Sequence, residues 1–406
     1  MTPTQALDVA SISATTSSFP ELEAATAELE TPYAVIDLGA LAANARALTT
    51  RAAGKPVRLA TKSVRCRAIS DAVLDLDGYA GVLALTLPEA LWLAESCTDV
   101  VVGYPSVDRA ALRRLAADET LASRVTLMVD SIEQIDFIES TVPVGAPPIR
   151  VCLDLDASLR LLQGRVHLGT RRSPVHTPEA AGRLALAITA RPRVRLVGLM
   201  AYEGQVAGLG DNTGSRLHQL QIRAVQALSI GELARRRAAA VAAVREVVEL
   251  EFVNGGGTGS IESTVAEDAV TEVAAGSGLY CPTLFDGYRR FRPRPAAYFV
   301  TSVVRRPSPT MATVLGGGWV ASGVPAPDRL PSPVWPTGLA LTGLEGAGEA
   351  QTPLAHGGEL RVGDRVWFRH AKAGELCERV DTLHLVHEGR LVASVPTYRG
   401  EGRAFL

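Results

Sequence analysis

Short apolar runs alternate with longer amphipathic stretches between Thr31 and about Tyr280. The apolar runs predict strands over 57–61, 80–85, 99–103, 124–129, 149–154, 195–201, 251–254 and 278–281. The amphipathic stretches predict helices that include 38–51, 88–96, 108–117, 178–190, 219–248 and 265–275. Such alternation is typical of repeated βα units that build a parallel sheet.

Eight βα units in roughly 250 residues predict a (β/α)8 TIM barrel rather than a doubly wound sheet. The pattern changes after Asp286, where β-rich runs at 298–304 and 311–315 precede a proline-rich stretch. We therefore predict an α/β chain with a barrel domain over 29–285 and a mostly β C-terminal domain over 286–406. Residues 1–28 are rich in Ala, Ser and Thr and are predicted to form a flexible N-terminal arm.

Composition and charge exclude several classes of protein. The net charge of -2 offers no basic field for nucleic acid or anionic lipid. No apolar run is long enough to span a bilayer, and the first basic residue is Arg46, so the start of the chain lacks the basic flank of a signal peptide. The five cysteines include no CxxC pair, which argues against a disulfide framework or a zinc ribbon. We expect a cytoplasmic protein without a nucleic-acid or membrane partner.

Lysine is rare in this chain and marks a candidate site. Among 41 basic side chains only Lys55, Lys62 and Lys372 are lysines. Lys62 follows the apolar run 57–61, and thus lies at the carboxyl end of the first predicted barrel strand, where α/β barrels keep their chemistry. A lysine can form a Schiff base, which an arginine cannot. The alternative is a solvated lysine in a loop.

A glycine-rich loop is the second chemical feature. It comprises Asn254, Gly255, Gly256, Gly257, Thr258, Gly259 and Ser260, and it follows a predicted strand late in the barrel. Glycines allow backbone N–H groups to crowd around an anion, and the two hydroxyls can add donors. We predict a phosphate-binding loop; the alternative is a flexible turn. A lysine amine after the first strand and a phosphate loop near the last strands together suit pyridoxal 5'-phosphate.

Five segments, at 31–37, 60–63, 200–204, 254–260 and 276–280, carry a family resemblance. Together they resemble the fold-type III pyridoxal phosphate enzymes of the D-threonine aldolase and D-serine dehydratase family, whose barrel is of the alanine racemase N-terminal domain type. The resemblance covers roughly Thr31 to Phe405. It implies that Lys62 carries the cofactor, that the glycine loop and Tyr280 lie at its phosphate, and that Tyr202 lies near its ring. Taken alone, either tyrosine is better explained by ordinary core packing than by a function.

The resemblance implies a lyase that acts on a D-3-hydroxy amino acid, by retro-aldol cleavage or by dehydration, through a Schiff base on Lys62. An amino-acid racemase is one alternative, since it differs only by a second base on the opposite face of Cα. A non-catalytic pyridoxal phosphate carrier or regulator is another, although a carrier would not need the second domain. We also expect a homodimer.

In that family a divalent metal is bound near the carboxyl terminus through His-x-Cys or His-x-Asp. The matching segment here is His370-Ala371-Lys372, and an ammonium group cannot coordinate a metal. In one hypothesis His370 binds zinc or manganese together with Cys377 or with Glu375. In the other, the positive charge of Lys372 replaces the metal. In both cases His370 is the candidate catalytic group for the β-oxygen of the substrate.

A cluster of basic residues provides one further candidate. Arg160, His167, Arg171 and Arg172 could bind a substrate carboxylate, because arginine presents a planar pair of donors to it. Surface salt bridges are an equally good explanation of the same residues.

Overall fold

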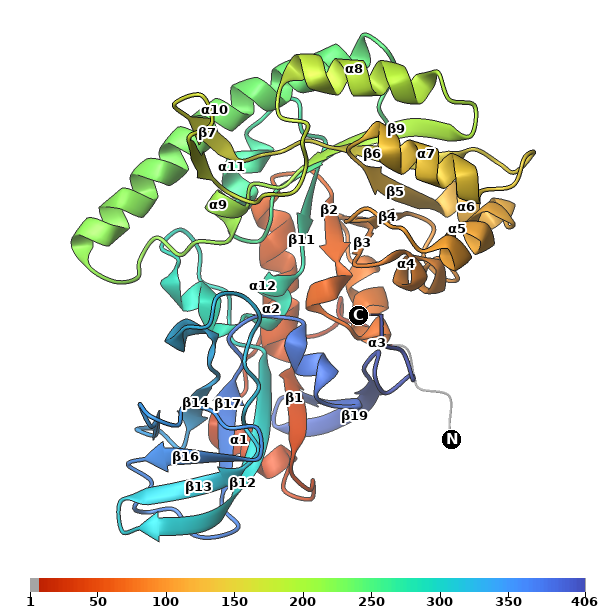
Figure 1. Cartoon of the computed structure of the whole chain (residues 1–406). Helices are drawn as coiled ribbons and strands as arrows, with labels where there is room; N and C mark the ends of the chain where they lie inside the picture. Colours follow the sequence, from red (N-terminus) through yellow and green to blue (C-terminus); the bar gives the residue numbers. More distant parts are fainter. Residues whose placement is uncertain (1–6, 406) are drawn as a thin grey trace. The chain divides into compact units, whose positions relative to one another are not determined.

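The structure is a computed structural model and describes residues 7–405 (Figure 1). The described chain divides into two compact units, and each is discontinuous in sequence. The unit containing Leu48–Lys62 and Asp77–Gly276 is built on a closed barrel and is called the barrel unit here. The unit containing residues 7–47, Ser63–Leu76 and Ser277–Ala404 is built on an open sheet and is called the sheet unit.

Within residues 7–405, eight parallel strands close the barrel in the order β10, β11, β2, β3, β4, β5, β6, β9. They are β2 (Val57–Ala60), β3 (Tyr79–Ala84), β4 (Val100–Val102), β5 (Val125–Val129), β6 (Ile149–Asp154), β9 (Val194–Ala201), β10 (Phe252–Gly255) and β11 (Glu272–Ala275). The strands predicted from 57–61 through 251–254 all coincide with observed ones. The closed barrel confirms the prediction of a TIM barrel. The sequence could predict it because a strand that is buried on both faces must be continuously apolar.

The last barrel strand was placed wrongly by the sequence pattern. The predicted strand 278–281 is the short helix α12 (Ser277–Tyr280), and the predicted helix 265–275 contains β11. β11 pairs with both β10 and β2, so pairing with its neighbours overrides the local helical pattern. A Cβ on Gly276 would lie 2.3 Å from the Ala60 carbonyl oxygen, so only glycine allows this close approach to β2.

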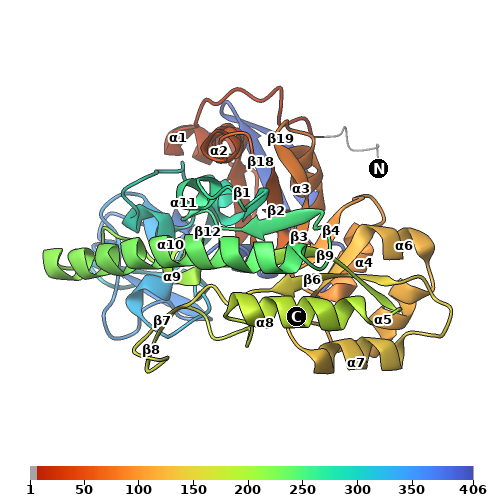
Figure 2. The ribbon, with the colours of Figure 1, turned by 90° about the horizontal axis from the view of Figure 1, so that it is seen from above.

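Helices of the barrel unit surround the strands. They are α4 (Leu87–Leu93), α5 (Arg109–Ala116), α6 (Glu119–Arg124), α7 (Ile132–Thr141), α8 (Pro178–Thr189), α9 (Gly204–Ala207), α10 (Arg216–Arg245) and α11 (Ile261–Val265). The predicted helices 88–96, 108–117, 178–190 and 219–248 correspond to α4, α5, α8 and α10. Side-chain N-caps such as Thr86 and Asp108 fix the first turns. α8 and α10 pack side by side, as Figure 2 shows, and a hairpin of β7 (Leu159–Leu161) and β8 (Val166–Leu168) follows β6.

The barrel interior is apolar above a buried polar cluster. Ala60, Leu83, Val101 and Met128 are among the side chains of the apolar core. Arg58 lies on the same face of β2 as Ala60 but two residues earlier, and its guanidinium pairs with Glu272 at 2.6 Å and with Asp99 at 2.8 Å. In this cluster the buried positive charge of Arg58 is paired with two carboxylates. The cluster lies away from the carboxyl ends of the strands, where barrels keep their chemistry, so we regard it as structural.

The sheet unit confirms the predicted β-rich C-terminal domain. Its strands are β1 (Tyr33–Asp37), β12 (Ala297–Ser308), β13 (Met311–Leu315), β14 (Ser332–Trp335), β15 (Ala340–Leu341), β16 (Gln351–Ala355), β17 (Arg365–Arg369), β18 (Thr382–His387) and β19 (Arg390–Pro396). The main strand order is β15, β16, β13, β12, β1, β18, β19, with β17 joining β12 to β14. The accompanying helices are α1 (Phe19–Ala25), α3 (Arg67–Leu74) and α12, and α2 (Leu38–Arg51) follows β1 as predicted.

The boundaries of the units differ from the predicted ranges 29–285 and 286–406. β1 pairs antiparallel with β12 and parallel with β18, so this early strand belongs to the sheet unit, and the long continuous segment of the barrel unit ends at Gly276. The predicted N-terminal arm is also folded where it is described, from residue 7 on. Leu22 of α1 is 1% exposed, and Phe19 stacks on Trp335 at 5.5 Å. Residues 1–6 of that arm lie outside the described residues. No helix within 7–405 is long and apolar enough to span a membrane.

Candidate active site

Lys62 lies in a single 3-10 turn (Thr61–Ser63) immediately after β2. Thr61 anchors this turn, because its buried hydroxyl is 2.7 Å from the Glu89 carboxylate and 3.2 Å from the Leu83 carbonyl oxygen. The Lys62 ammonium donates a hydrogen bond to the phenol oxygen of Tyr104 at 2.6 Å. The structure therefore presents Lys62 at the carboxyl end of the barrel, as its sequence position predicted.

Tyr104 was not predicted as a site residue. It follows β4 after a single glycine, so it also lies at the carboxyl end of a barrel strand. That position was available from the sequence, since strand 99–103 was predicted directly before it. Burial alone raises the pKa of Tyr104, but the positive charges of Lys62 and Arg172 outweigh burial and hold it below its ordinary value.

Arg172 links two tyrosines at this end of the barrel. Its guanidinium carbon lies 5.3 Å from the ring centroid of Tyr104 and 5.4 Å from that of Tyr202. Burial raises the pKa of Tyr202 to about 12, so its phenol stays protonated at neutral pH. Of the predicted basic cluster, Arg160 forms an ion pair with Asp156 at 2.5 Å, whereas Arg172 faces the tyrosines. Arg172 is thus the member of that cluster placed to attract an anion.

Asp154 ends β6 beside the Arg172 loop, because the Ser173 hydroxyl donates a 2.6 Å hydrogen bond to the Asp154 carbonyl oxygen. Burial, followed by repulsion from Asp130, raises the pKa of the Asp154 carboxyl to about 7, although Arg172 acts in the opposite direction. This carboxyl can therefore exchange a proton near neutral pH.

A buried carboxylate stabilises the glycine loop by hydrogen bonds. Glu203 accepts hydrogen bonds from the Gly256 backbone at 3.2 Å and from the Ser260 hydroxyl at 2.9 Å, and it is also bonded by Thr264. Arg237 of α10 donates to the same carboxylate at 2.8 Å. Neither Glu203 nor Arg237 was predicted, because their partners lie far away in sequence. Ser260 and the Gly256 N–H thus serve the loop's own structure.

Close packing explains the glycines in this loop. Gly256 adopts a φ of 83°, a region that side chains disfavour. A Cβ on Gly257 would lie 3.0 Å from the Ala207 Cβ and 3.1 Å from a ring carbon of Tyr202. The loop and Tyr202 are therefore neighbours, as the predicted cofactor site requires.

The remaining loop residues have distinct surroundings. The Asn254 amide donates to Glu272 at 2.8 Å, so its side chain joins the buried polar cluster of the barrel. The Thr258 carbonyl oxygen accepts a hydrogen bond from Arg51 at 2.6 Å. For Gly255, a Cβ would approach Thr264 to 3.0 Å. Only part of the predicted set thus faces Tyr202.

The other predicted site residues belong to the sheet unit. Tyr280 lies on α12 rather than on a strand, and its buried hydroxyl donates to the Val64 carbonyl oxygen at 3.0 Å. The Cys377 thiol donates to the same oxygen at 3.1 Å, and burial raises its pKa. The structure brings Tyr280 and Cys377 together around Val64.

His370 directly follows β17 and is 3% exposed. Burial, with a smaller effect of Arg369, lowers its pKa to about 3, so the imidazole is neutral at physiological pH. The Lys372 ammonium donates to the Ser322 carbonyl oxygen at 3.2 Å. Within residues 7–405 no three His, Cys, Asp or Glu side chains form a group that could hold a metal ion.

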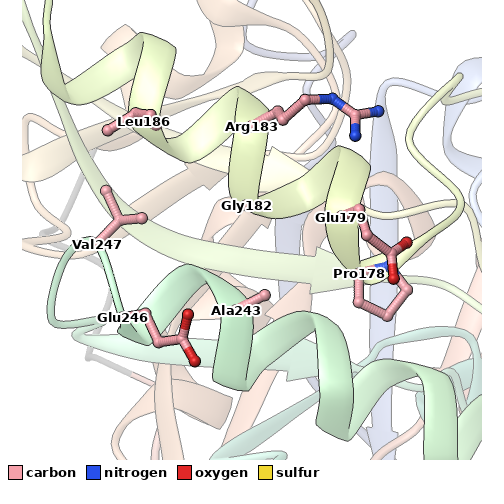
Figure 3. Close-up of a pocket in the computed structure, with 8 residues that line it drawn as sticks. All are labelled: Pro178, Glu179, Gly182, Arg183, Leu186, Ala243, Glu246 and Val247. Carbon is pink, nitrogen blue, oxygen red and sulfur yellow. The ribbon is translucent and has the colours of Figure 1, made fainter.

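A separate groove lies between α8 and α10 (Figure 3). Arg183 and Leu186 of α8 and Ala243 of α10 are among the residues that line it, and Glu246 lies just beyond α10. Lys62, Tyr104 and the glycine loop are not among its lining residues, so we do not assign the candidate site to it.

A closed eight-stranded barrel with a lysine directly after its first strand, in a chain that also contains a mostly β unit, has the fold of the fold-type III pyridoxal phosphate enzymes. The family model for the alanine racemase N-terminal domain matches residues 36–283. The chain belongs to this family, which confirms the resemblance seen in its sequence.

Relatives with known activities are similar over most of the chain. The 3-hydroxy-D-aspartate aldolase of Paracoccus denitrificans is 26% identical over 304 residues, covering 71% of this chain and 72% of the relative. The D-threonine aldolase of an Arthrobacter species is 28% identical over 294 residues, covering 70% of each chain.

Solved structures share the fold. The D-threonine aldolase of Filomicrobium marinum has a TM-score of 0.75 at 22% identity and covers 92% of this chain and 97% of its own. The D-threo-3-hydroxyaspartate dehydratase of Delftia sp. HT23 has a TM-score of 0.69 at 20% identity, with 91% and 98% covered. The likeness extends over both units of the chain.

Proposed function

We propose that the protein is a pyridoxal phosphate-dependent lyase that acts on a D-3-hydroxy amino acid. The observation that carries the proposal is Lys62 at the carboxyl end of β2, in a barrel whose glycine loop touches Tyr202. The relatives named above are aldolases and a dehydratase, which favours a lyase over a racemase. A non-catalytic carrier is disfavoured for the same reason.

The residues of the barrel unit fit the cofactor. Lys62 offers an amine for its aldehyde, the glycine at position 257 lets the loop pack directly against Tyr202, and Arg172 supplies positive charge beside two aromatic rings. When bound, pyridoxal phosphate supplies an electron sink for the bond broken at Cα. The chain's own residues hold and orient: Tyr202 packs against the loop, and Arg172 attracts a carboxylate or the ring oxygen. Within the loop, the phosphate would be bound by donors other than the Gly256 N–H and the Ser260 hydroxyl, which bond to Glu203.

His370 is proposed to act on the β-hydroxyl of the substrate. Because its pKa is about 3, the ring is a weak base and stays neutral with one N–H donor and one acceptor nitrogen. We therefore propose that it orients the hydroxyl by a hydrogen bond. His370→Gln, which keeps a donor and an acceptor, should retain more turnover than His370→Leu.

For the metal we propose the alternative without one. The donor set does not fit a divalent ion: Lys372 stands at the second ligand position, and Cys377 is a buried thiol that resists becoming a thiolate. His370 and Cys377 as ligands for zinc or manganese remain the competing hypothesis. No step of the proposed mechanism runs through a metal.

Two further proposals concern the setting of the protein. We propose a homodimer, supported by Leu217, Leu220 and Leu228 on the first half of α10, which are 60% to 67% exposed and of the kind that a second copy would cover. Sedimentation of wild type and of a Leu220→Glu variant tests it. We also propose a cytoplasmic location, since no disulfide joins the cysteines, all of which lie within residues 7–405.

The reaction is tested by products. Purified protein is incubated with D-threonine, D-serine, D-3-hydroxyaspartate and D-alanine. Aldol cleavage releases glycine and an aldehyde, dehydration releases a 2-oxo acid and ammonia, and racemisation yields the L-isomer. We expect one of the first two outcomes, abolished in Lys62→Ala. Formation of L-alanine alone would establish a racemase, and cofactor binding without any product would establish a carrier.

A further inference from the structure

The phenol of Tyr104 is placed on the amine that must react. Tyr104 Oη and Lys62 Nζ are 2.6 Å apart, a short charge-assisted distance, and the two residues are 42 positions apart in sequence. We propose that Tyr104 is a catalytic residue that exchanges a proton with Lys62 while the cofactor is bound to or released from that lysine. The inference rests on the proposed role of Lys62 and adds a partner to it.

The surroundings of the phenol favour its ionised form. Lys62 approaches from the turn after β2, and the Arg172 guanidinium lies 5.3 Å from the Tyr104 ring centroid. Asp154 at the end of β6 opposes ionisation and Tyr202 is a neutral neighbour, but the two cations outweigh burial and Asp154. The pKa of the Tyr104 phenol is therefore held below that of an ordinary tyrosine.

The proton transfer balances without a further reactant. An amine attacks a carbonyl carbon only when its nitrogen has a lone pair, so the Lys62 ammonium must first lose one proton. Tyr104 phenolate takes that proton, which gives a neutral amine and a neutral phenol. When the substrate displaces Lys62, the same phenol returns the proton to the leaving amine. The net charge of the pair is unchanged in each direction.

The first measurement is an ultraviolet titration of the full-length protein freed of cofactor. Wild type should contain a tyrosine that ionises below the ordinary tyrosine range. That titration should vanish in Tyr104→Phe and persist in Tyr79→Phe, a matched loss of one phenol from β3 of the same unit. In Lys62→Met it should move to higher pH, because burial then acts with one cation fewer against it. A wild-type spectrum in which every tyrosine titrates normally would overturn the proposal.

The second measurement is the rate at which added pyridoxal phosphate becomes covalently attached, trapped by borohydride and counted by mass. Loss of a general acid–base group costs about 100-fold or more, so Tyr104→Phe should attach cofactor about 100-fold more slowly at neutral pH. High pH should restore much of the rate, since hydroxide then takes the proton. Tyr79→Phe should match wild type.

Separate outcomes distinguish the two proposals. Attachment at the wild-type rate in a folded Tyr104→Phe protein overturns the role of Tyr104 and leaves that of Lys62 intact. Covalent cofactor in Lys62→Met overturns the proposed function itself. Should Tyr104→Phe fail to fold, Arg172→Gln keeps the phenol but removes one cation, and it should raise the pKa of Tyr104 and slow attachment at neutral pH; no change in either contradicts the inference.

Discussion

Two of the three lysines lie in the barrel unit and make different contacts. Lys62 donates to the Tyr104 phenol at 2.6 Å, whereas Lys55 donates to the Glu267 carbonyl oxygen at 2.7 Å. We predict that Lys62→Ala abolishes covalent cofactor attachment and the visible colour of the protein, and that Lys55→Ala retains both. Absorbance and borohydride trapping measure the difference. Trapped cofactor in Lys62→Ala would sink the lysine assignment.

The glycine loop permits a second test at single residues. We predict that Gly257→Ala weakens pyridoxal phosphate binding by at least tenfold, because the added methyl group would meet Ala207 and Tyr202 at 3.0 to 3.1 Å. Gly182→Ala on α8 is the control, since its Cβ would find ordinary contacts at 3.5 Å. Equilibrium dialysis measures both affinities. Equal affinities would place the phosphate away from this loop.

The related Gly256→Val should also weaken binding, through strain at its φ of 83°.

His370 gives the protein a predictable acid sensitivity. The pKa of His370 is about 3 in the folded chain, whereas an ordinary histidine, as in the unfolded chain, has a pKa of 6.5. Between these two pH values the unfolded chain therefore binds a proton that the folded chain does not. Stability from this residue is present above about pH 6.5 and is lost as the pH falls toward 3. In His370→Gln the free energy of unfolding should fall less steeply, by up to about 1.4 kcal/mol per pH unit. Identical slopes in urea titrations would contradict a buried neutral histidine.

At the scale of elements, α10 supports the glycine loop from outside the barrel. Arg237 is fully buried in the second half of this helix and pairs with Glu203 at 2.8 Å and Glu267 at 2.9 Å. Removing one partner of a buried ion pair leaves uncompensated charge and costs about 3–5 kcal/mol. We predict a loss of this size for Arg237→Met in urea unfolding, together with weaker cofactor binding.

Arg235 provides the matched control on the same helix. It is exposed, so Arg235→Met should change stability by no more than about 0.5 kcal/mol. Equal effects of the two substitutions would mean that the ion pair of Arg237 with Glu203 does not stabilise the loop. The result therefore separates helix propensity from the buried contact.

At the scale of the whole molecule, metal content separates the two hypotheses for the sheet unit. We predict that purified, active protein carries no stoichiometric divalent ion, that chelators leave its activity unchanged, and that Lys372→Ala lowers turnover at least tenfold. Elemental analysis is the measurement, and Cys377→Ala is the companion variant. A stoichiometric zinc or manganese ion lost in Cys377→Ala would instead establish His370 and Cys377 as ligands.

The sequence by itself determined the features that depend on local pattern. Strands buried on both faces must be continuously apolar, so the barrel strands from 57–61 to 251–254 were readable, and with them the position of Lys62 after the first strand. Three consecutive glycines marked this segment as a candidate loop, because glycine adopts backbone conformations that other residues disfavour. The departure at Lys372 from the family's metal motif was also visible, because an ammonium group cannot coordinate a metal.

Only the tertiary structure decided which distant residues meet. Tyr104 lies 42 positions from Lys62, and Glu203 lies 53 positions before Gly256, so neither pair has a local signal. β11 became a strand because β10 and β2 pair with it on both sides, against a sequence that reads as helix. β1 joined the sheet unit because β12 and β18 supply its hydrogen bonds. In each case the deciding energy is a contact between segments that the closed barrel or the sheet brings together, and no window of sequence contains both partners.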